Sequence, residues 1–317
     1  MLSRTASDLY WLSRLVERAE NTARMLDVAW NLSMMPFVAN PRDEMMAPLM
    51  ISGTHELYMS RHDDVQVREV LHFFTLDQDN PGSIFNCLRL ARENGHAVRG
   101  KITAEMWESI NSTWLELKEI RRGGLDQYGA SAFFDWVKKR SHLFRGATYG
   151  TIMRNDAFRF LRIGTFIERA DNTARILDVK YQIGTLYGSH HGVPSGGDAM
   201  DFYRWHALLH SVGAYESYRE LYSEAINADR VAELLVLGAE VPRSLRSCMQ
   251  MLCELLPAIE GQTGQTAKRL AAVQFARLQY GDLEHVLDTG LHDYLTDFLR
   301  RINELADTIR EEYLEVV

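Results

Sequence analysis

Residues 17–28 read ERAENTARMLDV, and residues 168–179 read ERADNTARILDV, so one twelve-residue stretch occurs twice in this chain. Ten of the twelve positions are identical, and the two differences are Glu to Asp and Met to Ile. We call residues 17–28 the first copy and residues 168–179 the second copy. Similarity at this level is not a chance event, and it predicts an internal duplication.

A weaker repeat follows each copy, at an offset of 161 residues. It consists of Pro81, Ser83 and Cys87 in one half and Pro242, Ser244 and Cys248 in the other. The second unit is predicted to begin near Arg154. We therefore expect two helical halves, residues 1–150 and 151–317, which together form one compact domain.

The sequence around the first copy has the periodicity of a helix. Apolar residues recur every three or four positions, at Leu9, Leu12, Val16, Ala19, Ala23, Leu26 and Trp30. This spacing places them on one stripe of an α-helix. The chain shows no convincing run of the alternating strand pattern. The predicted fold is all-α, with two pseudo-symmetric helical-bundle halves.

Proline, glycine and polar clusters predict the loops, at residues 36–48, 77–82, 122–124 and 184–197. Asn80 before Pro81 indicates a helix N-cap followed by proline at the first helical position, where a missing N–H costs nothing.

Polar residues are kept in the repeat together with the apolar ones. On a helical wheel Glu17, Asn21 and Arg24 lie on one side, next to the apolar stripe, and their counterparts in the second copy do the same. Glu20 and Arg24 also have the i,i+4 spacing of an ion pair. Both helices are therefore expected to face a constrained environment and to lie against each other near the centre of the molecule, where like polar faces can satisfy one another.

Three interpretations of these polar faces stay open: a buried polar network in which every group is paired, a cleft that binds a polar ligand, and a surface for a partner. The candidates for the network are Glu20, Asp27, Asp171 and Asp178. The candidates for ligand binding are Arg18, Asn21, Arg24, Arg169, Asn172 and Arg175. If the protein is an enzyme, the candidate acid and base are Glu17 and Glu168.

Metal and nucleotide sites have little support in the sequence. Glu69 with His72 and Glu93 with His96 match the Glu-x-x-His element of di-metal helical bundles, which also need carboxylates from two further helices. Both matches lie in one half, away from the repeat, so they are only weak metal candidates. The chain has neither the glycine spacing of a phosphate-binding loop nor a Gly-x-Ser-x-Gly elbow. We expect no cofactor.

Composition excludes further classes. The 317 residues are 46% hydrophobic, enough for a sizeable core, and carry a net charge of −8, which gives no general attraction to nucleic acid or anionic membranes. The three cysteines have no metal or redox spacing and are expected to be buried thiols of a reducing compartment. No apolar segment is long enough to cross a bilayer. We therefore expect a cytoplasmic protein.

Both copies, the opening MLSRTASDLYWLSRLVERAENTAR and the run ARENGHAVRGKITAEMWESIN at residues 91–111 resemble the bacterial Alpha-E family, an α-helical domain named for its Glu-Arg motif. The resemblance covers essentially the whole chain and includes GLHDYL at residues 290–295. The resemblance implies that this protein is a companion, in some cases a fusion partner, of three kinds of enzyme. These are circularly permuted ATP-grasp ligases, transglutaminase-like peptidases and proteasome-related hydrolases.

The resemblance implies a role in making, modifying or processing a peptide-like amide product. The expected function is that of an accessory or substrate-binding protein that works with an ATP-grasp amide ligase. The resemblance also implies a transglutaminase-like peptidase as a further partner and a peptide-like compound as the substrate. The alternative is an enzyme of the same pathway that uses the carboxylates and arginines of the two copies, and a di-metal bundle is a remote third.

Overall fold

The computed structural model describes residues 1–35, 41–187, 199–261 and 264–315. Within these residues the protein is built from sixteen α-helices and one π-helical turn, without strands. The first eight helices are α1 (Ser3–Ser33), α2 (Pro41–Ile51), α3 (His55–Met59), α4 (Val67–Thr75), α5 (Ile84–Ala97), α6 (Ala104–Gly123), α7 (Leu125–Tyr128) and α8 (Ala130–Thr151). The others are α9 (Asp156–Tyr187), α10 (Ala199–Val212), α11 (Tyr215–Leu221), α12 (Ala228–Leu237), α13 (Leu245–Ala258), α14 (Gln265–Gln279), α15 (Leu283–Thr289), α16 (Leu291–Ile309) and the turn η1 (Arg310–Leu314). The all-α prediction is confirmed.

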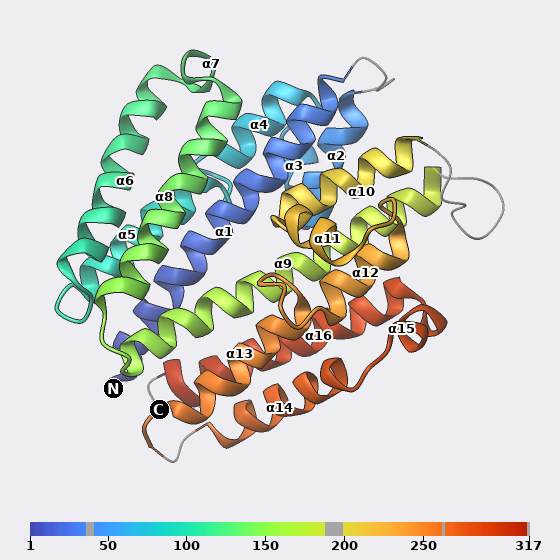
Figure 1. Ribbon diagram of the computed structural model, residues 1–317. Helices are drawn as coiled ribbons and strands as arrows, with labels where there is room; N and C mark the ends of the chain where they lie inside the picture. Colours follow the sequence, from blue (N-terminus) through green and yellow to red (C-terminus); the bar gives the residue numbers. More distant parts are fainter. Residues whose placement is uncertain (36–40, 188–198, 262–263, 316–317) are drawn as a thin grey trace.

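The two longest helices, α1 and α9, pack against each other in the middle of the molecule (Figure 1). They carry the first and the second copy, so the expectation that the repeated helices lie side by side is confirmed. Helices α5, α6 and α8 pack on the α1 side, and α13, α14 and α16 pack on the α9 side (Figure 1).

The central contact depends on a glycine. A Cβ atom at Gly164 would collide with the backbone carbonyl of Tyr10 and with the hydroxyl of Ser13. Ser13 occupies the position in α1 that Gly164 occupies in α9, and its hydroxyl donates to the carbonyl of Leu161. The two long helices can approach this closely because glycine has no side chain.

The helices follow the same order on the two sides. Helices α4, α5, α6 and α8 begin 161 residues before α12, α13, α14 and α16, respectively. Ser83 and Ser244 both act as N-cap by accepting a backbone N–H, and Gly129 and Gly290, with φ of 91° and 87°, stand at the N-caps of α8 and α16. The origin of this order in a duplication stays a prediction.

The loop predicted at residues 184–197 lies outside the described residues except for 184–187, which belong to α9. Two further local predictions were wrong. Residues 41–48, expected in a loop, belong to α2, which tolerates Pro41 because the first residues of a helix need no intrahelical N–H donor. The helix after Pro81 is capped by Ser83 and not by Asn80. The Asn80 side chain instead accepts the Gly82 N–H and donates to the Phe73 carbonyl.

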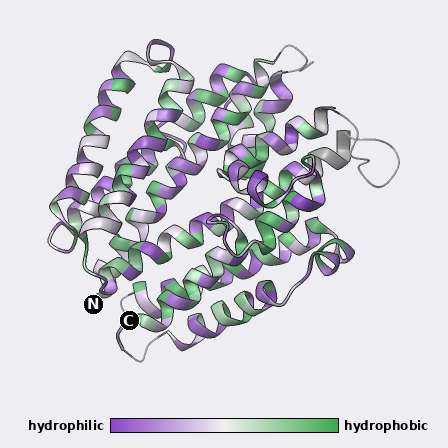
Figure 2. Cartoon of the chain, viewed as in Figure 1, coloured by the Kyte–Doolittle hydropathy of each residue, from purple (hydrophilic) through white to green (hydrophobic). Residues whose placement is uncertain are grey.

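The core follows the predicted stripe. Leu9, Leu12 and Leu26 are fully buried, while Trp30 is partly buried against the same core. Figure 2 shows hydrophobic and hydrophilic residues alternating along single helices, as expected for helices that each bury one side. Among the described residues, no helix combines the length and apolar character needed to cross a membrane.

Candidate functional site

Where α1 crosses α9, each helix gives a Glu and an Arg to the other. Glu17 accepts hydrogen bonds from Nε (2.9 Å) and Nη2 (3.1 Å) of Arg169. Glu168 accepts from Nε (2.6 Å) and Nη2 (2.9 Å) of Arg18. Glu17 and Glu168 are equivalent positions of the repeat, as are Arg18 and Arg169, so the contact is reciprocal in the manner of a twofold interface. Bidentate pairs of this kind are the strong form of the Arg–carboxylate bond.

Both carboxylates of the crossing are removed from water and ionised. Glu17 is 2% exposed and Glu168 is 5% exposed. Burial alone would raise the pKa of Glu168, but Arg18 and Arg14 outweigh it and lower the pKa to about 2. The same balance, with Arg169 and Arg243 as the cations, holds the pKa of Glu17 well below its ordinary range.

The first copy is covered by neighbouring elements. The Glu20 carboxylate accepts from Ser141 of α8 (2.6 Å), from Arg243 (2.8 Å) and from Arg24 (2.8 Å), and it also pairs with Arg145 of α8. Arg243, in the residues just before α13, further donates to Glu17 and to Asn21, at 2.8 Å each.

Asn21 is only partly satisfied. Its Oδ1 accepts from Arg243, but its buried Nδ2 has no hydrogen-bond partner among the described residues. A free buried donor of this kind is costly, and it keeps Asn21 a candidate for ligand binding.

The second copy is more open. Arg175 donates from Nε (2.8 Å) and Nη2 (3.1 Å) to Asp171, in the i,i+4 pair expected from the sequence. The side chain of Arg175 is 37% exposed and that of Asp171 is 17% exposed. Asn172 is half-buried, and its side chain makes no hydrogen bond within the described residues. This face can therefore meet a polar ligand or a partner, whereas the equivalent face of the first copy is covered.

The last acidic residue of each copy bonds to a basic side chain from another helix. Asp27 accepts from Lys138 of α8 at 2.8 Å, and Asp178 lies 2.6 Å from Nδ1 of His292 on α16. Such bonds fit the structural network to which these two residues and Glu20 are assigned, an assignment that stays a prediction.

The geometry limits what Glu17 and Glu168 can do chemically. A general acid or base must exchange a proton near neutral pH and reach its substrate. Each carboxylate is instead bound by at least two guanidinium groups, and the pKa of each is lowered. This arrangement favours a structural role for the pair, and a catalytic role stays a prediction.

Four arginines at the crossing escaped the sequence analysis: Arg14, Arg145, Arg162 and Arg243. At the offsets of the repeat, the residue that corresponds to Arg14 is Thr165 and the residue that corresponds to Arg243 is Gly82. A comparison of the two halves therefore does not identify these two arginines. Arg243 could have been identified from the sequence by its position between Pro242 and Ser244, which both belong to the weaker repeat.

The weak metal candidates lie apart from the crossing, on α4 and α5. Glu69 accepts from the hydroxyl of Tyr58, and Glu93 pairs with Arg89 at 2.9 Å. His96 lies against the ring of Trp107. Among the described residues, no group of three or more His, Cys, Asp or Glu side chains could hold a metal ion.

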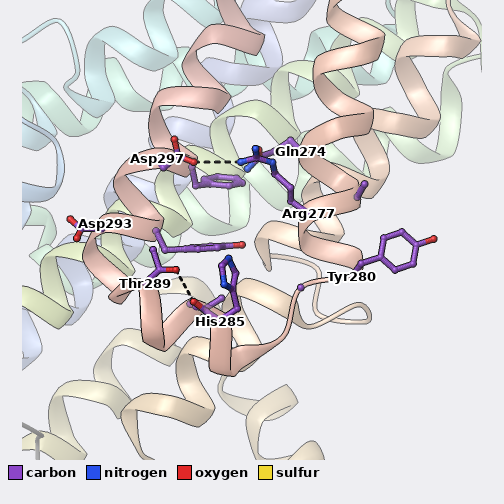
Figure 3. A pocket seen from close by; sticks show the side chains of 12 residues that line it. Gln274, Arg277, Tyr280, His285, Thr289, Asp293 and Asp297 are labelled. Carbon is purple, nitrogen blue, oxygen red and sulfur yellow. Dashed lines mark hydrogen bonds and ion pairs between the residues drawn. The ribbon is translucent and has the colours of Figure 1, made fainter.

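Two larger hollows lie away from both copies. A groove of about 1060 Å³, lined in part by Glu69 and His72, lies beside α4 and α7. A cleft of about 530 Å³ lies between α14, α15 and α16. Figure 3 shows Arg277 in this cleft directed towards Asp297, 3.6 Å away, with His285 below them. The sequence analysis placed no candidate in the cleft, although Asp293 of GLHDYL lines it.

Two of the three cysteines are fully buried, as expected. Burial raises the pKa of both Cys87 and Cys248 to about 12. Cys253 is only partly buried, and burial raises its pKa to about 11. Thiols with such pKa values are poor nucleophiles at neutral pH.

The fold and the crossing define an all-α protein in which two central helices exchange Glu–Arg pairs. The chain belongs to the Alpha-E family, whose description is a predicted alpha-helical domain with a conserved ER motif and which matches residues 1–314. The Glu–Arg dipeptides at residues 17–18 and 168–169 fit that description. The resemblance inferred from the sequence is therefore confirmed.

Among known proteins, the chain is similar to a protein of Mycobacterium bovis and to proteins of two Mycobacterium tuberculosis strains, all three named only as uncharacterized. Each is 26% identical over 340 aligned residues, which cover 96% of this chain and 36% of the relative. The chain thus spans about a third of the length of these relatives. No solved structure matches it.

Proposed function

We propose that this protein is a non-catalytic accessory or substrate-binding module that works with an ATP-grasp amide ligase in the synthesis, modification or processing of a peptide-like product. The observation that carries the non-catalytic part is the state of Glu17 and Glu168. Both are buried and bound by two or more arginines, so the repeated motif supports a rigid helical body better than it supports acid–base chemistry.

The ligase partnership rests on the family resemblance and on the length of the relatives. In the mycobacterial proteins the matching region is 36% of a longer chain, so a module of this kind occurs there together with other segments. A domain that is joined to others in some proteins is a natural candidate for non-covalent association in others.

The half-open face of the second copy is the proposed contact for ligand or partner. Arg175 is the best-placed group, because it is 37% exposed and bonds to a single carboxylate, that of Asp171. Its guanidinium group can bind a second carboxylate in bidentate fashion, such as the end of a peptide or an acidic side chain of the ligase.

The test is reconstitution. The tagged chain is co-expressed with a circularly permuted ATP-grasp ligase, the complex is isolated, and the products formed from ATP and the twenty amino acids are identified by mass spectrometry. We expect co-purification and an amide product that needs both proteins. A ligase that neither binds this chain nor gains activity from it would overturn the proposal.

Two variants separate a specific effect from a general one. Arg175→Ala is expected to lower product formation at least tenfold without changing the melting temperature. Arg300→Ala is the matched control, because Arg300 is an exposed α16 arginine that also pairs with an Asp, at 2.7 Å, and lies outside both copies. Equal activity of the two variants would remove the second copy from the proposed contact.

We also infer that the two halves arose by duplication and are related by a rotation near 180°. The reciprocal Glu–Arg pairs and the constant spacing of 161 residues between corresponding helices support this relation. Superposition of residues 3–151 on 156–309 in an experimental structure tests it. Unrelated positions of α5 and α13 after that superposition would contradict it.

A further inference from the structure

A small cavity lies between α1, α8 and α9, directly beside the Glu–Arg crossing. It has a volume of about 20 Å³ and is lined by Glu17, Arg145 and Arg162 together with hydroxyl and apolar side chains. A cavity of about 10–15 Å³ or more holds one water-sized particle, so this one has room for a single water or a monatomic ion. We call it the arginine cavity.

Arg162 is the unusual member of the arginine cavity. It is 4% exposed, and among the described residues its buried Nε has no hydrogen-bond partner. Its Cζ lies 4.3 Å from the ring centre of Tyr149 and 4.4 Å from that of Phe166. These rings stabilise the cation but accept no ordinary hydrogen bond. A buried guanidinium N–H without an acceptor is rare and costly.

The charges around the cavity do not balance. Five arginines gather on this side of the crossing, and they are Arg24, Arg145, Arg162, Arg169 and Arg243. The buried carboxylates that they share are Glu17 and Glu20. Burial lowers the pKa of Arg145 and of Arg162 to about 10, which still leaves both charged at neutral pH. Five positive charges therefore face two carboxylates here, and of the five arginines only Arg24 also has a further acidic group, Asp27, acting on it.

The hydroxyl groups that line the cavity do not supply the missing negative charge. Ser141 donates to Glu20, while Thr148 and Thr165 donate to backbone carbonyls of their own helices. The donors left for a particle in the cavity are the N–H groups of Arg145 and Arg162. Arg145 is 25% exposed, so ions from solvent can reach the cluster.

We propose that the arginine cavity is a binding site for one small monovalent inorganic anion of the size of chloride, held between Arg145 and Arg162. The anion would give Arg162 the acceptor that the protein withholds and offset part of the excess charge beside Glu17. This inference stands apart from the proposed ligase partnership, because it concerns the isolated chain.

A crystal of the protein soaked in sodium bromide gives the direct test. Bromide replaces chloride and scatters anomalously, so we expect an anomalous peak in the cavity, within hydrogen-bond distance of Arg162 and Arg145 nitrogens. A cavity that holds only water, without anomalous signal, would overturn the proposal.

Thermal unfolding tests the same site in solution. Sodium chloride is exchanged for sodium gluconate at constant ionic strength, because gluconate is too bulky for the cavity. We expect the melting temperature to rise with the logarithm of the chloride concentration above its Kd, and the rise should be about 2 °C at roughly tenfold Kd. Equal melting temperatures in the two salts would contradict the proposal. Stabilisation by acetate but not by chloride would also contradict it and would assign the site to a carboxylate group.

Arg162→Met separates this site from general salt effects, because Met keeps an apolar chain between the two rings and removes the charge. The chloride dependence and the bromide peak should both vanish in this variant. Arg159→Met is the control, since Arg159 lies on the same helix and pairs with Asp156 at 2.8 Å outside the cavity. It should keep both signals. A chloride effect that survives in Arg162→Met would overturn the assignment, and if that variant fails to fold, the bromide and gluconate experiments on the unmodified protein decide alone.

Discussion

The first and the second copy have nearly the same sequence but different surroundings. In the first copy, Glu20 is completely buried and has bonds to Ser141, Arg145 and Arg243, which come from α8 and from the residues before α13. In the second copy, Asp171 remains partly exposed and bonds to Arg175. The difference arises from what packs on each helix, since the positions that supply Ser141, Arg145 and Arg243 hold Ile302, Ala306 and Gly82 in the other half.

This contrast shows how a repeated motif can hold a fold together in one half and remain available in the other. The part that stays symmetric is the crossing itself, where the Glu of each copy bonds to the Arg of the other. The parts that differ are the acidic residue three positions later and its surroundings. A ligand or partner site is therefore expected on the second copy, and the loss of stability on mutation is expected to be larger in the first.

The largest expected effect is that of Glu17→Gln. This change leaves the buried Arg169 without its carboxylate partner and takes from the buried Arg243 one of its two, and breaking a buried pair costs about 3–5 kcal/mol of unfolding free energy. Glu168→Gln is expected to cost about 2–3 kcal/mol, because Arg18, which is 34% exposed, can turn towards water. Urea denaturation of both variants measures the difference. Equal losses would mean that the two copies are not distinct in burial.

The pH dependence of stability tests the second of these pairs, that of Glu168. The pKa of Glu168 is lowered from 4.5 to about 2 in the folded state, so its pairing stabilises the protein above pH 4.5, and that contribution is lost as the pH falls towards 2. The stability difference between the unmodified protein and Glu168→Gln should thus shrink by about 2 kcal/mol between pH 5 and pH 3. Denaturant titrations at the two pH values test this. A difference independent of pH would show that Glu168 is not held in its ionised form.

The smallest effects separate Arg24 from Arg175. Arg24→Ala removes one of several bonds to a fully buried carboxylate, that of Glu20, and should cost about 1–2 kcal/mol. Arg175→Ala breaks a half-exposed i,i+4 pair and should cost about 0–1 kcal/mol. Thermal and urea unfolding of both variants gives the two values. A larger loss of stability for Arg175→Ala than for Arg24→Ala would contradict the conclusion that the first copy is the covered one.

The sequence predicted the parts of the fold that are local or repeated. The stripe from Leu9 to Leu26 identified the buried side of α1, and the two copies identified α1 and α9 as neighbours. Local chemistry was less reliable where residues compete for one role, as at Ser83, which caps α5 in place of the predicted Asn80. Both residues favour N-caps, and only the packing of Asn80 against Phe73 decides between them.

The site was predicted less completely than the fold. The repeat identified Glu17, Glu168 and their neighbours, but it gave no indication that Arg18 and Arg169 would each bind the carboxylate of the opposite copy. Arg145 and Arg243 lie 125 and 223 residues from the Glu20 that they bind, and no periodicity connects residues at such separations. Because these arginines have no counterpart in the other half, comparison of the chain with itself also omits them.

The central claim is that the exchanged Glu–Arg pairs hold the two long helices together, and that the buried pair of Glu17 with Arg169 does so more strongly than the more exposed pair of Glu168 with Arg18. Double-mutant cycles on Glu17→Gln with Arg169→Met and on Glu168→Gln with Arg18→Met measure this directly, because each cycle isolates the energy of one pair. The account predicts a coupling of about 2–3 kcal/mol for Glu17 with Arg169 and of about 1 kcal/mol for Glu168 with Arg18. Couplings below about 0.5 kcal/mol for both pairs, or a larger value for the second, would contradict it.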